Sequence, residues 1–124
     1  MAAFNQDRPI YLQIADRLCN EILSGRYKAD ERIPSVRDYA ALLQVNSNTS
    51  VKAYEQLARD EIIYQRRGMG YYVSAGAHEQ ILAHRRKELM HEKLQQLFHD
   101  MQLLGISIDE VVEAYQSYNI NNKK

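Results

Sequence analysis

The sequence has one cysteine, two prolines and no tryptophan in 124 residues, and it lacks any long apolar run. The single Cys19 excludes an intramolecular disulfide and is expected to be buried as a small apolar side chain. Without a signal segment or a span of about 20 apolar residues, the chain is expected to be soluble and cytoplasmic, with no membrane partner. The length suits one compact domain with a small appendage.

An excess of positive charge is also missing, because 16 Lys and Arg balance 16 Asp and Glu. The chain therefore lacks the strongly basic total that marks many nucleic-acid binders, and any such function must come from charge placement. Enzymatic motifs are absent too: there is no Ser-His-Asp set, paired carboxylate motif, HExxH, CxxC or glycine-rich nucleotide loop. We therefore expect neither an enzyme nor a cofactor.

Four histidines, at positions 78, 84, 91 and 99, recur along one predicted helix. Metal ligands on a helix favour i, i+3 or i+4 spacing, whereas these residues lie about two turns apart. The spacing predicts no metal site within one chain. A site across a dimer axis stays open.

The stretch from Pro34 to Leu57 predicts two short helices joined by a tight polar turn. Ser35 and Asp38 form a cap-like start to the first helix. The connecting segment 44–46 has only three residues, so it must form a sharp turn. The apolar residues of this first helix fall on one face: Val36, Tyr39, Ala40 and Leu43. The pattern is typical of a helix-turn-helix.

The second helix of this pair is capped by Asn46 or Ser47 in our interpretation. Near its start, Asn48, Thr49 and Lys52 point away from the apolar face, where they can reach base edges and phosphates in a major groove. The alternative is that these polar residues only cap the helix and its exposed first turn. The predicted inward face consists of Val51, Tyr54, Leu57 and Ala58.

Two β-branched and aromatic runs, 62–66 and 71–73, flank a glycine-containing turn and predict a β-hairpin. Arg66 and Arg67 place positive charge beside the turn, and Gly68 allows the backbone to approach another surface closely. A phosphate-binding nucleotide loop is excluded, because such a loop leads into a helix and here a strand follows.

A helical pattern runs from Ala77 to Leu104, and Gly105 ends it. Ser107 and Glu110 then form a capping box for a second short helix, and residues 121–124 are expected to be a disordered end. The first of these helices carries a heptad-like apolar stripe: Met90, Leu94, Leu97, Phe98, Met101 and Leu104. Two helices this apolar are expected to pack on each other and then on the same pair from a second subunit.

Five blocks along the first three-fifths of the chain resemble the GntR family of bacterial transcription regulators. They are PIYLQIADRLCNEILSG at 9–25, RIPSVRDYA at 32–40, VNSNT at 45–49, KAYEQLARDEII at 52–63 and RRGMGYYVS at 66–74. The short two-helix tail is similar to that of the YtrA branch. The resemblance implies a mainly α fold with a small β-hairpin: a winged helix-turn-helix DNA-binding domain at 1–75 and a helical dimerisation tail at 76–124.

The resemblance also implies roles for particular residues. Arg37 matches an arginine of the family motif that contacts DNA, whereas from the residues alone it could form a surface salt bridge with Asp38 or Asp60. The hairpin corresponds to the wing, whose tip reaches a minor groove or its phosphates. Asp30 and Glu61 stand where the family usually has glycine, so the local backbone is expected to differ if either position needs a positive φ.

The sequence therefore favours a sequence-specific DNA-binding transcriptional regulator, expected to be a repressor that binds a palindromic double-stranded operator as a homodimer. The alternative is a winged-helix module that binds protein without specific DNA binding. Family analogy suggests a small-molecule effector, but no residue of the sequence shows one.

Overall fold

The structure is a computed structural model that describes residue 4 and residues 8–122, and it divides into two compact units, 1–84 and 85–124. This division falls after the boundary that we placed at residue 75. The reason is that Ala77 and Ile81, which follow the hairpin, are buried in the core of the first unit. Whether the two units are a DNA-binding and a dimerisation domain stays a prediction.

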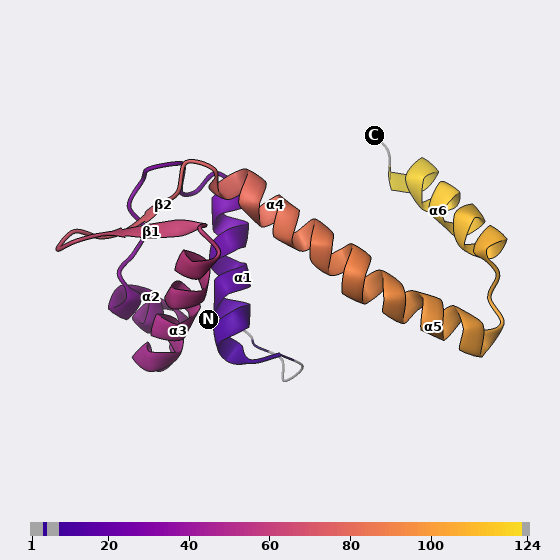
Figure 1. The fold of residues 1–124 in the computed structure, drawn as a ribbon, viewed down its shortest axis with the longest axis horizontal. Helices are drawn as coiled ribbons and strands as arrows, with labels where there is room; N and C mark the ends of the chain where they lie inside the picture. The colour runs from indigo at the N-terminus through magenta and orange to yellow at the C-terminus, as the bar shows by residue number, and fades with distance from the viewer. Residues whose placement is uncertain (1–3, 5–7, 123–124) are drawn as a thin grey trace. The chain divides into compact units, whose positions relative to one another are not determined.

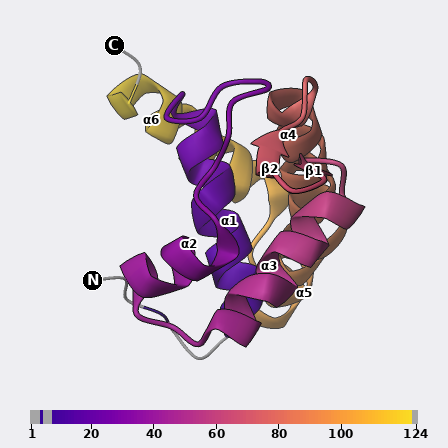
Figure 2. The ribbon, with the colours of Figure 1, turned by 90° about the vertical axis from the view of Figure 1, so that its left-hand side faces the viewer.

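The first unit is mainly α-helical with one antiparallel hairpin, which confirms the predicted winged-helix fold (Figure 1). Its elements are α1 (Ile10–Leu23), α2 (Val36–Leu43), α3 (Ser47–Arg59), β1 (Ile63–Arg66), β2 (Gly70–Val73) and the start of α4 (Ala77–Glu88). Helix α3 packs against both α1 and α2 (Figure 2). Cys19 is buried in this core, as expected.

The ends of α2 and α3 follow the predicted capping. The Ser35 hydroxyl accepts a hydrogen bond from the backbone N–H of Asp38 at 3.0 Å, and the Asn46 side chain accepts one from the N–H of Asn48 at 2.7 Å. Gln44 ends α2 in the left-handed conformation, with φ 59°. These local bonds satisfy helix-end amides that would otherwise lack partners, and they fix the corner between the two helices.

The buried face of α3 differs from the predicted one. Ser50 and Ala53 are fully buried with Tyr54 and Leu57, whereas Val51 is 37% exposed. The prediction is confirmed for Tyr54 and Leu57, and Ala58 is partly buried against the core, but apolarity wrongly favoured Val51 over Ser50 and Ala53. The small side chains at 50 and 53 allow α3 to pack closely against α1 and α2. A pattern based on hydrophobicity alone does not predict close packing through small residues.

A short segment before α2 pairs with the hairpin, and the sequence analysis did not predict this pairing. Beside the β1–β2 ladder, the segment 30–33 pairs with β2 through an isolated bridge between Arg32 and Tyr72. The backbone N–H of Asp30 donates to the carbonyl of Val73 at 2.8 Å, and that of Ile33 donates to the carbonyl of Tyr71 at 3.0 Å. The connector before α2 is thereby attached to the wing.

Asp30 and Glu61 both adopt a positive φ, 65° and 61°. The expectation that the backbone would differ at these positions is therefore wrong, because the left-handed conformation is kept without glycine. At Asp30 the carboxylate accepts a hydrogen bond from the Tyr64 hydroxyl at 2.9 Å, which offsets part of the strain and raises the pKa of Tyr64. No such side-chain bond is found for Glu61 within the described ranges.

The second unit contains η1 (Leu89–Lys93), α5 (Leu94–Leu104) and α6 (Ile108–Asn122). The helix predicted from 77 to 104 is therefore interrupted by a π turn. The capping box between Ser107 and Glu110 is confirmed by two reciprocal bonds of 2.8 and 3.2 Å. Helix α6 continues to Asn122, so the predicted disordered end is wrong for Asn121 and Asn122, and Lys123 and Lys124 lie outside the described residues.

The two tail helices do not pack on each other as predicted, because α5 and α6 make hardly any contact between described residues. In this unit Met101 is 7% exposed, whereas Leu97 is 42% and Leu104 is 70% exposed. Most of the apolar stripe is thus open to solvent in a single chain, whereas Met101 is buried and Leu94 is half-buried. No helix in the described part of the chain is long and apolar enough to span a membrane.

Replacing Glu61 with glycine should stabilise the first unit by about 0.5–1 kcal/mol, because relief of left-handed strain exceeds the entropy that glycine gains on unfolding. Asp30→Gly is the matched control, and its gain should be smaller because the bond to Tyr64 is lost. Urea unfolding of both variants measures this. A destabilised Glu61→Gly protein would show that Glu61 has a stabilising contact that outweighs the strain.

Candidate nucleic-acid interface

Arg37 lies in the first turn of α2 and is exposed. It forms no ion pair with any residue that the structure describes, so neither Asp38 nor Asp60 neutralises it. Asp60 instead accepts hydrogen bonds from the side-chain amide of Gln56 at 3.2 and 3.3 Å. The geometry disfavours the salt-bridge alternative and leaves the guanidinium available to an anion.

Tyr54 links the elements that carry the candidate contacts. Its hydroxyl donates a 2.6 Å hydrogen bond to the carbonyl of Pro34, two residues before α2 begins. Its ring lies 6.1 Å from that of Tyr39 in α2 and 5.2 Å, edge to face, from that of Tyr71 in β2. Burial raises the pKa of Tyr54 well above its usual range, so the hydroxyl keeps the proton that it donates. The sequence had assigned Tyr54 to the core only.

The first turn of α2 has a second attachment through Tyr39. The Tyr39 hydroxyl donates a 2.9 Å hydrogen bond to Glu21 of α1, and burial together with this bond raises the pKa of Tyr39. Arg17 and Arg26 each lie 3.9 Å from the Glu21 carboxylate. Helix α2 is therefore held against α1 by a hydrogen bond to a charged acceptor, which is stronger than a bond between neutral groups.

The three polar residues at the start of α3 are not equivalent. Asn48 is exposed, but Thr49 is half-buried and lines an open cleft of about 380 Å³ that also includes Phe4 and Ile10. The Lys52 ammonium lies 4.7 Å from the centre of the Tyr11 ring, so this side chain reaches toward α1. Asn48 and Lys52 are therefore exposed, and of the three only Thr49 is half-buried.

Val51 is a surface residue that the sequence assigned to the core. It follows Asn48 by three positions and so shares its side of α3, where an apolar side chain can contact the methyl group of thymine. The small residues Ser50 and Ala53 are the signal that could have revealed the exposure of Val51. They lie on the buried face of α3, and Val51 is the residue directly after Ser50.

At the wing, the guanidinium carbon of Arg66 lies 4.6 Å from the centre of the Tyr72 ring and 5.9 Å from that of Tyr64. Arg67 and Gly68 form the turn, and Gly68 adopts φ 74°. The turn is closed by a 2.9 Å bond from the backbone N–H of Met69 to the carbonyl of Arg66. The aromatic contacts hold Arg66 in place, whereas Arg67 is exposed at the tip.

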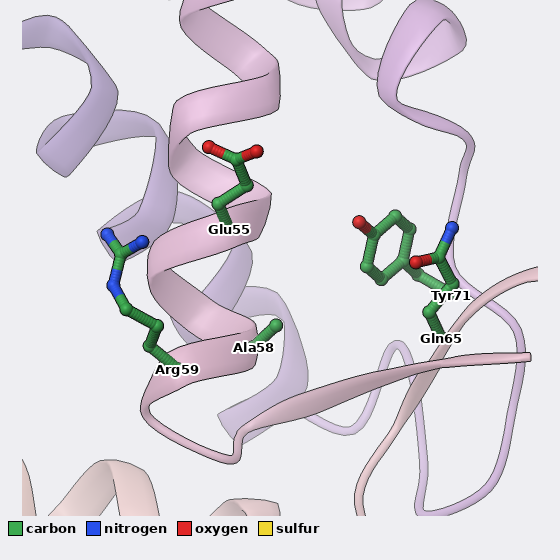
Figure 3. Close-up of a pocket in the computed structure, with 5 residues that line it drawn as sticks. All are labelled: Glu55, Ala58, Arg59, Gln65 and Tyr71. Atoms are coloured by element: carbon green, nitrogen blue, oxygen red, sulfur yellow. The ribbon is translucent and has the colours of Figure 1, made fainter.

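An open cleft of about 480 Å³ separates α3 from the hairpin (Figure 3). Glu55, Ala58 and Arg59 line it from the helix, and Gln65 and Tyr71 line it from the strands. No nucleophile with an adjacent base is among these residues, and the described residues contain no group of three side chains placed to hold a metal. The cleft is an open surface depression between α3 and the hairpin.

A helix-turn-helix, an exposed second helix and an arginine-bearing hairpin together define the winged-helix class of DNA-binding proteins. Residues 10–73 match the family described as bacterial regulatory proteins, gntR family. This match covers more than half of the chain, and the protein therefore belongs to the GntR family.

Relatives extend the similarity into the tail. The HTH-type transcriptional repressor YtrA of Bacillus subtilis is 35% identical over 105 residues, which are 85% of this chain and 80% of that protein. The structure of a putative GntR-family regulator from Bacteroides thetaiotaomicron shares 41% identity and a TM-score of 0.80, covering 92% of this chain and 99% of that one. The resemblance to YtrA-type regulators is confirmed.

The fold is also that of the AraR DNA-binding domain in complex with an operator, with a TM-score of 0.54 at 23% identity. That match covers 58% of this chain and 93% of the other, and it concerns the fold alone. The family match and the relatives show that the protein is a DNA-binding transcriptional regulator. Its relatives are regulators, which are not enzymes, and the alternative of a module without DNA binding has no support.

Arg37→Ala and Arg67→Ala should weaken binding to all duplexes nearly equally. Both guanidinium groups are exposed, form no ion pair with any residue that the structure describes, and are expected to contact phosphate. Each substitution should cost about 1–3 kcal/mol of binding free energy. It should also reduce the slope of log affinity against log salt concentration by about 1, which corresponds to one lost phosphate contact. Fluorescence anisotropy with an operator and a random duplex, at several salt concentrations, measures both quantities.

Two variants serve as controls for this measurement. Arg86→Ala removes the same charge outside the family segment and should bind normally. Asn48→Ala should instead narrow the difference between operator and random DNA, as expected for a base contact. If Arg37→Ala or Arg67→Ala lost affinity for the operator only, the residue would be a base reader and the phosphate role would be wrong.

Proposed function

We propose that the protein is a transcriptional repressor that binds a palindromic operator as a homodimer through its helical tail. The observation that supports this most strongly is the open apolar stripe of α5. Leu97 and Phe98 are 42% and 40% exposed, although they are large apolar residues on one face of a regular helix. A contiguous apolar surface of this kind on a small protein is typical of an interface.

The DNA-binding unit gives a second reason for a dimer. It contains one recognition helix and one wing, which can contact one half-site. Half-sites in a palindrome repeat about every 34–36 Å along the groove, so two units must be held in register for specific binding. A closed two-fold dimer satisfies this requirement because its symmetry matches that of the palindrome.

A separate role in DNA binding is proposed for each element. On α3, Asn48 and Thr49 read base edges from the first turn, and Lys52 contacts the adjacent backbone. On α2, Arg37 binds phosphate. The wing residues Arg66, Arg67 and Gly68 approach the minor groove or its phosphates, where a glycine allows close backbone contact.

The tail residues proposed for the dimer interface share the apolar side of η1 and α5: Met90, Leu94, Leu97, Phe98, Met101 and Leu104. Burial of such side chains contributes about 25 cal/mol per Å² of apolar surface. The repressor role rests on the name of the Bacillus subtilis relative. A small-molecule effector remains an expectation from family analogy.

Leu97→Asp should convert the dimer to a folded monomer, because an unpaired carboxylate in a dehydrated interface costs several kcal/mol. The first unit has its own core and should stay folded. Operator affinity should then collapse while weak binding to a single half-site persists. Light scattering and operator titration on the same sample test this.

Gln95→Asp is the matched control, since Gln95 is an exposed residue of the same helix outside the apolar stripe. This variant should remain a dimer and bind normally. A Leu97→Asp protein that is still fully dimeric at micromolar concentration would contradict the proposal and would indicate that the subunits meet elsewhere, through the first helix.

A further inference from the structure

One face of the wing brings together side chains from three adjacent backbone segments. Tyr64 and Arg66 are two positions apart on β1, so their side chains lie on the same side of the strand, because side chains alternate along it. Tyr72 pairs with Tyr64 and Gly70 pairs with Arg66, so these residues belong to the same face. Arg32 joins the face through its bridge with Tyr72. The face therefore carries two arginines around one glycine.

The Arg32 side chain lies across Gly70. Its Nε and Nη2 atoms are 3.1 and 3.3 Å from the position that a Cβ at residue 70 would occupy. Any side chain at this position would press on the guanidinium, and Gly70 also has φ 96°, which disfavours other residues. The absence of a side chain at residue 70 thus gives the Arg32 guanidinium its place on the wing.

Arg66 lies opposite this glycine on the neighbouring strand. It is the ladder partner of Gly70, and its guanidinium is held over the rings of Tyr72 and Tyr64. Arg32 and Arg66 are both exposed, and neither forms an ion pair with a residue that the structure describes. The carboxylate on this face, that of Asp30, is engaged by the Tyr64 hydroxyl.

Two like charges on one small face of the hairpin repel each other, and an anion bound between them would relieve that repulsion. We propose that Arg32 and Arg66 form a clamp for one backbone phosphate of duplex DNA, with Gly70 providing the space. Planar guanidinium groups bind phosphate in a bidentate manner, and the Tyr64 and Tyr72 rings and Gly70 orient them in advance. The inference rests on the proposed operator binding and adds Arg32 to its contacts.

The experiment measures binding of Arg32→Ala, Arg66→Ala and the double variant to the duplex selected by the wild-type protein from random sequences. Each single variant should lose about tenfold in affinity for operator and random DNA alike, and the salt slope should fall by about 1. Because both arginines hold one phosphate, the double variant should lose clearly less than the roughly hundredfold product of the two. Fully multiplicative losses would contradict a shared phosphate.

A phosphate scan makes the test specific. Single phosphates of the selected duplex are replaced by neutral methylphosphonate, one position at a time in each half-site. For the wild-type protein, one position beside the wing should be sensitive, and at that position both single variants should be insensitive. If the two variants lost sensitivity at different positions, the arginines would make separate contacts and the clamp would be wrong.

Two further variants test whether the loss of affinity comes from the loss of positive charge alone or from the loss of the planar guanidinium group. Lys28→Ala removes a positive charge from the same exposed connector and should bind like the wild type. Arg32→Lys keeps the charge without the planar fork and should recover only part of the loss. All variants should keep the wild-type melting temperature. Equal binding by Arg32→Ala and Lys28→Ala would overturn the clamp alone, whereas a wild-type protein that selects no duplex would contradict operator binding itself.

Discussion

The hydrogen bond from the Tyr54 hydroxyl to the carbonyl of Pro34 is the interaction on which the DNA-binding geometry depends. It joins the middle of α3 to the residue that precedes the α2 cap, and the Tyr54 ring also contacts rings of α2 and β2. A buried phenol without a partner would be costly, so the bond favours one arrangement of the two helices. Helix, turn and wing are therefore positioned as one body.

Much of the fold could be predicted from the sequence because its signals are local. The cap at Ser35, the corner before Asn46 and the hairpin turn at Gly68 each depend on neighbouring residues, and the structure confirms them. The burial of Ser50 could not be predicted, since α3 is buried by packing against α1 and α2, and that packing is not a local signal. The same limit applies to α5 and α6, whose packing was predicted from apolarity and is not formed in one chain.

Less of the candidate site could be predicted. The family pattern indicated Arg37 and the wing arginines, and their DNA contacts remain predictions. Arg32 was not among the predicted site residues, because its place on the wing arises from a bridge to Tyr72, forty residues along the chain, and from the space above Gly70. Because the total charge is balanced, DNA binding must depend on the placement of single exposed side chains such as Arg37 in α2 and Arg67 at the hairpin turn.

A double-mutant cycle between Tyr54→Phe and Arg37→Ala, measured by operator binding, tests the central claim most directly. Tyr54→Phe keeps the ring and removes the bond to Pro34, so it should weaken binding by shifting Arg37 at the start of α2. In the Arg37→Ala background the same change should cost less, with a coupling energy of about 0.5 kcal/mol or more. Fully additive losses would contradict the account, because Tyr54 would then not position the arginine.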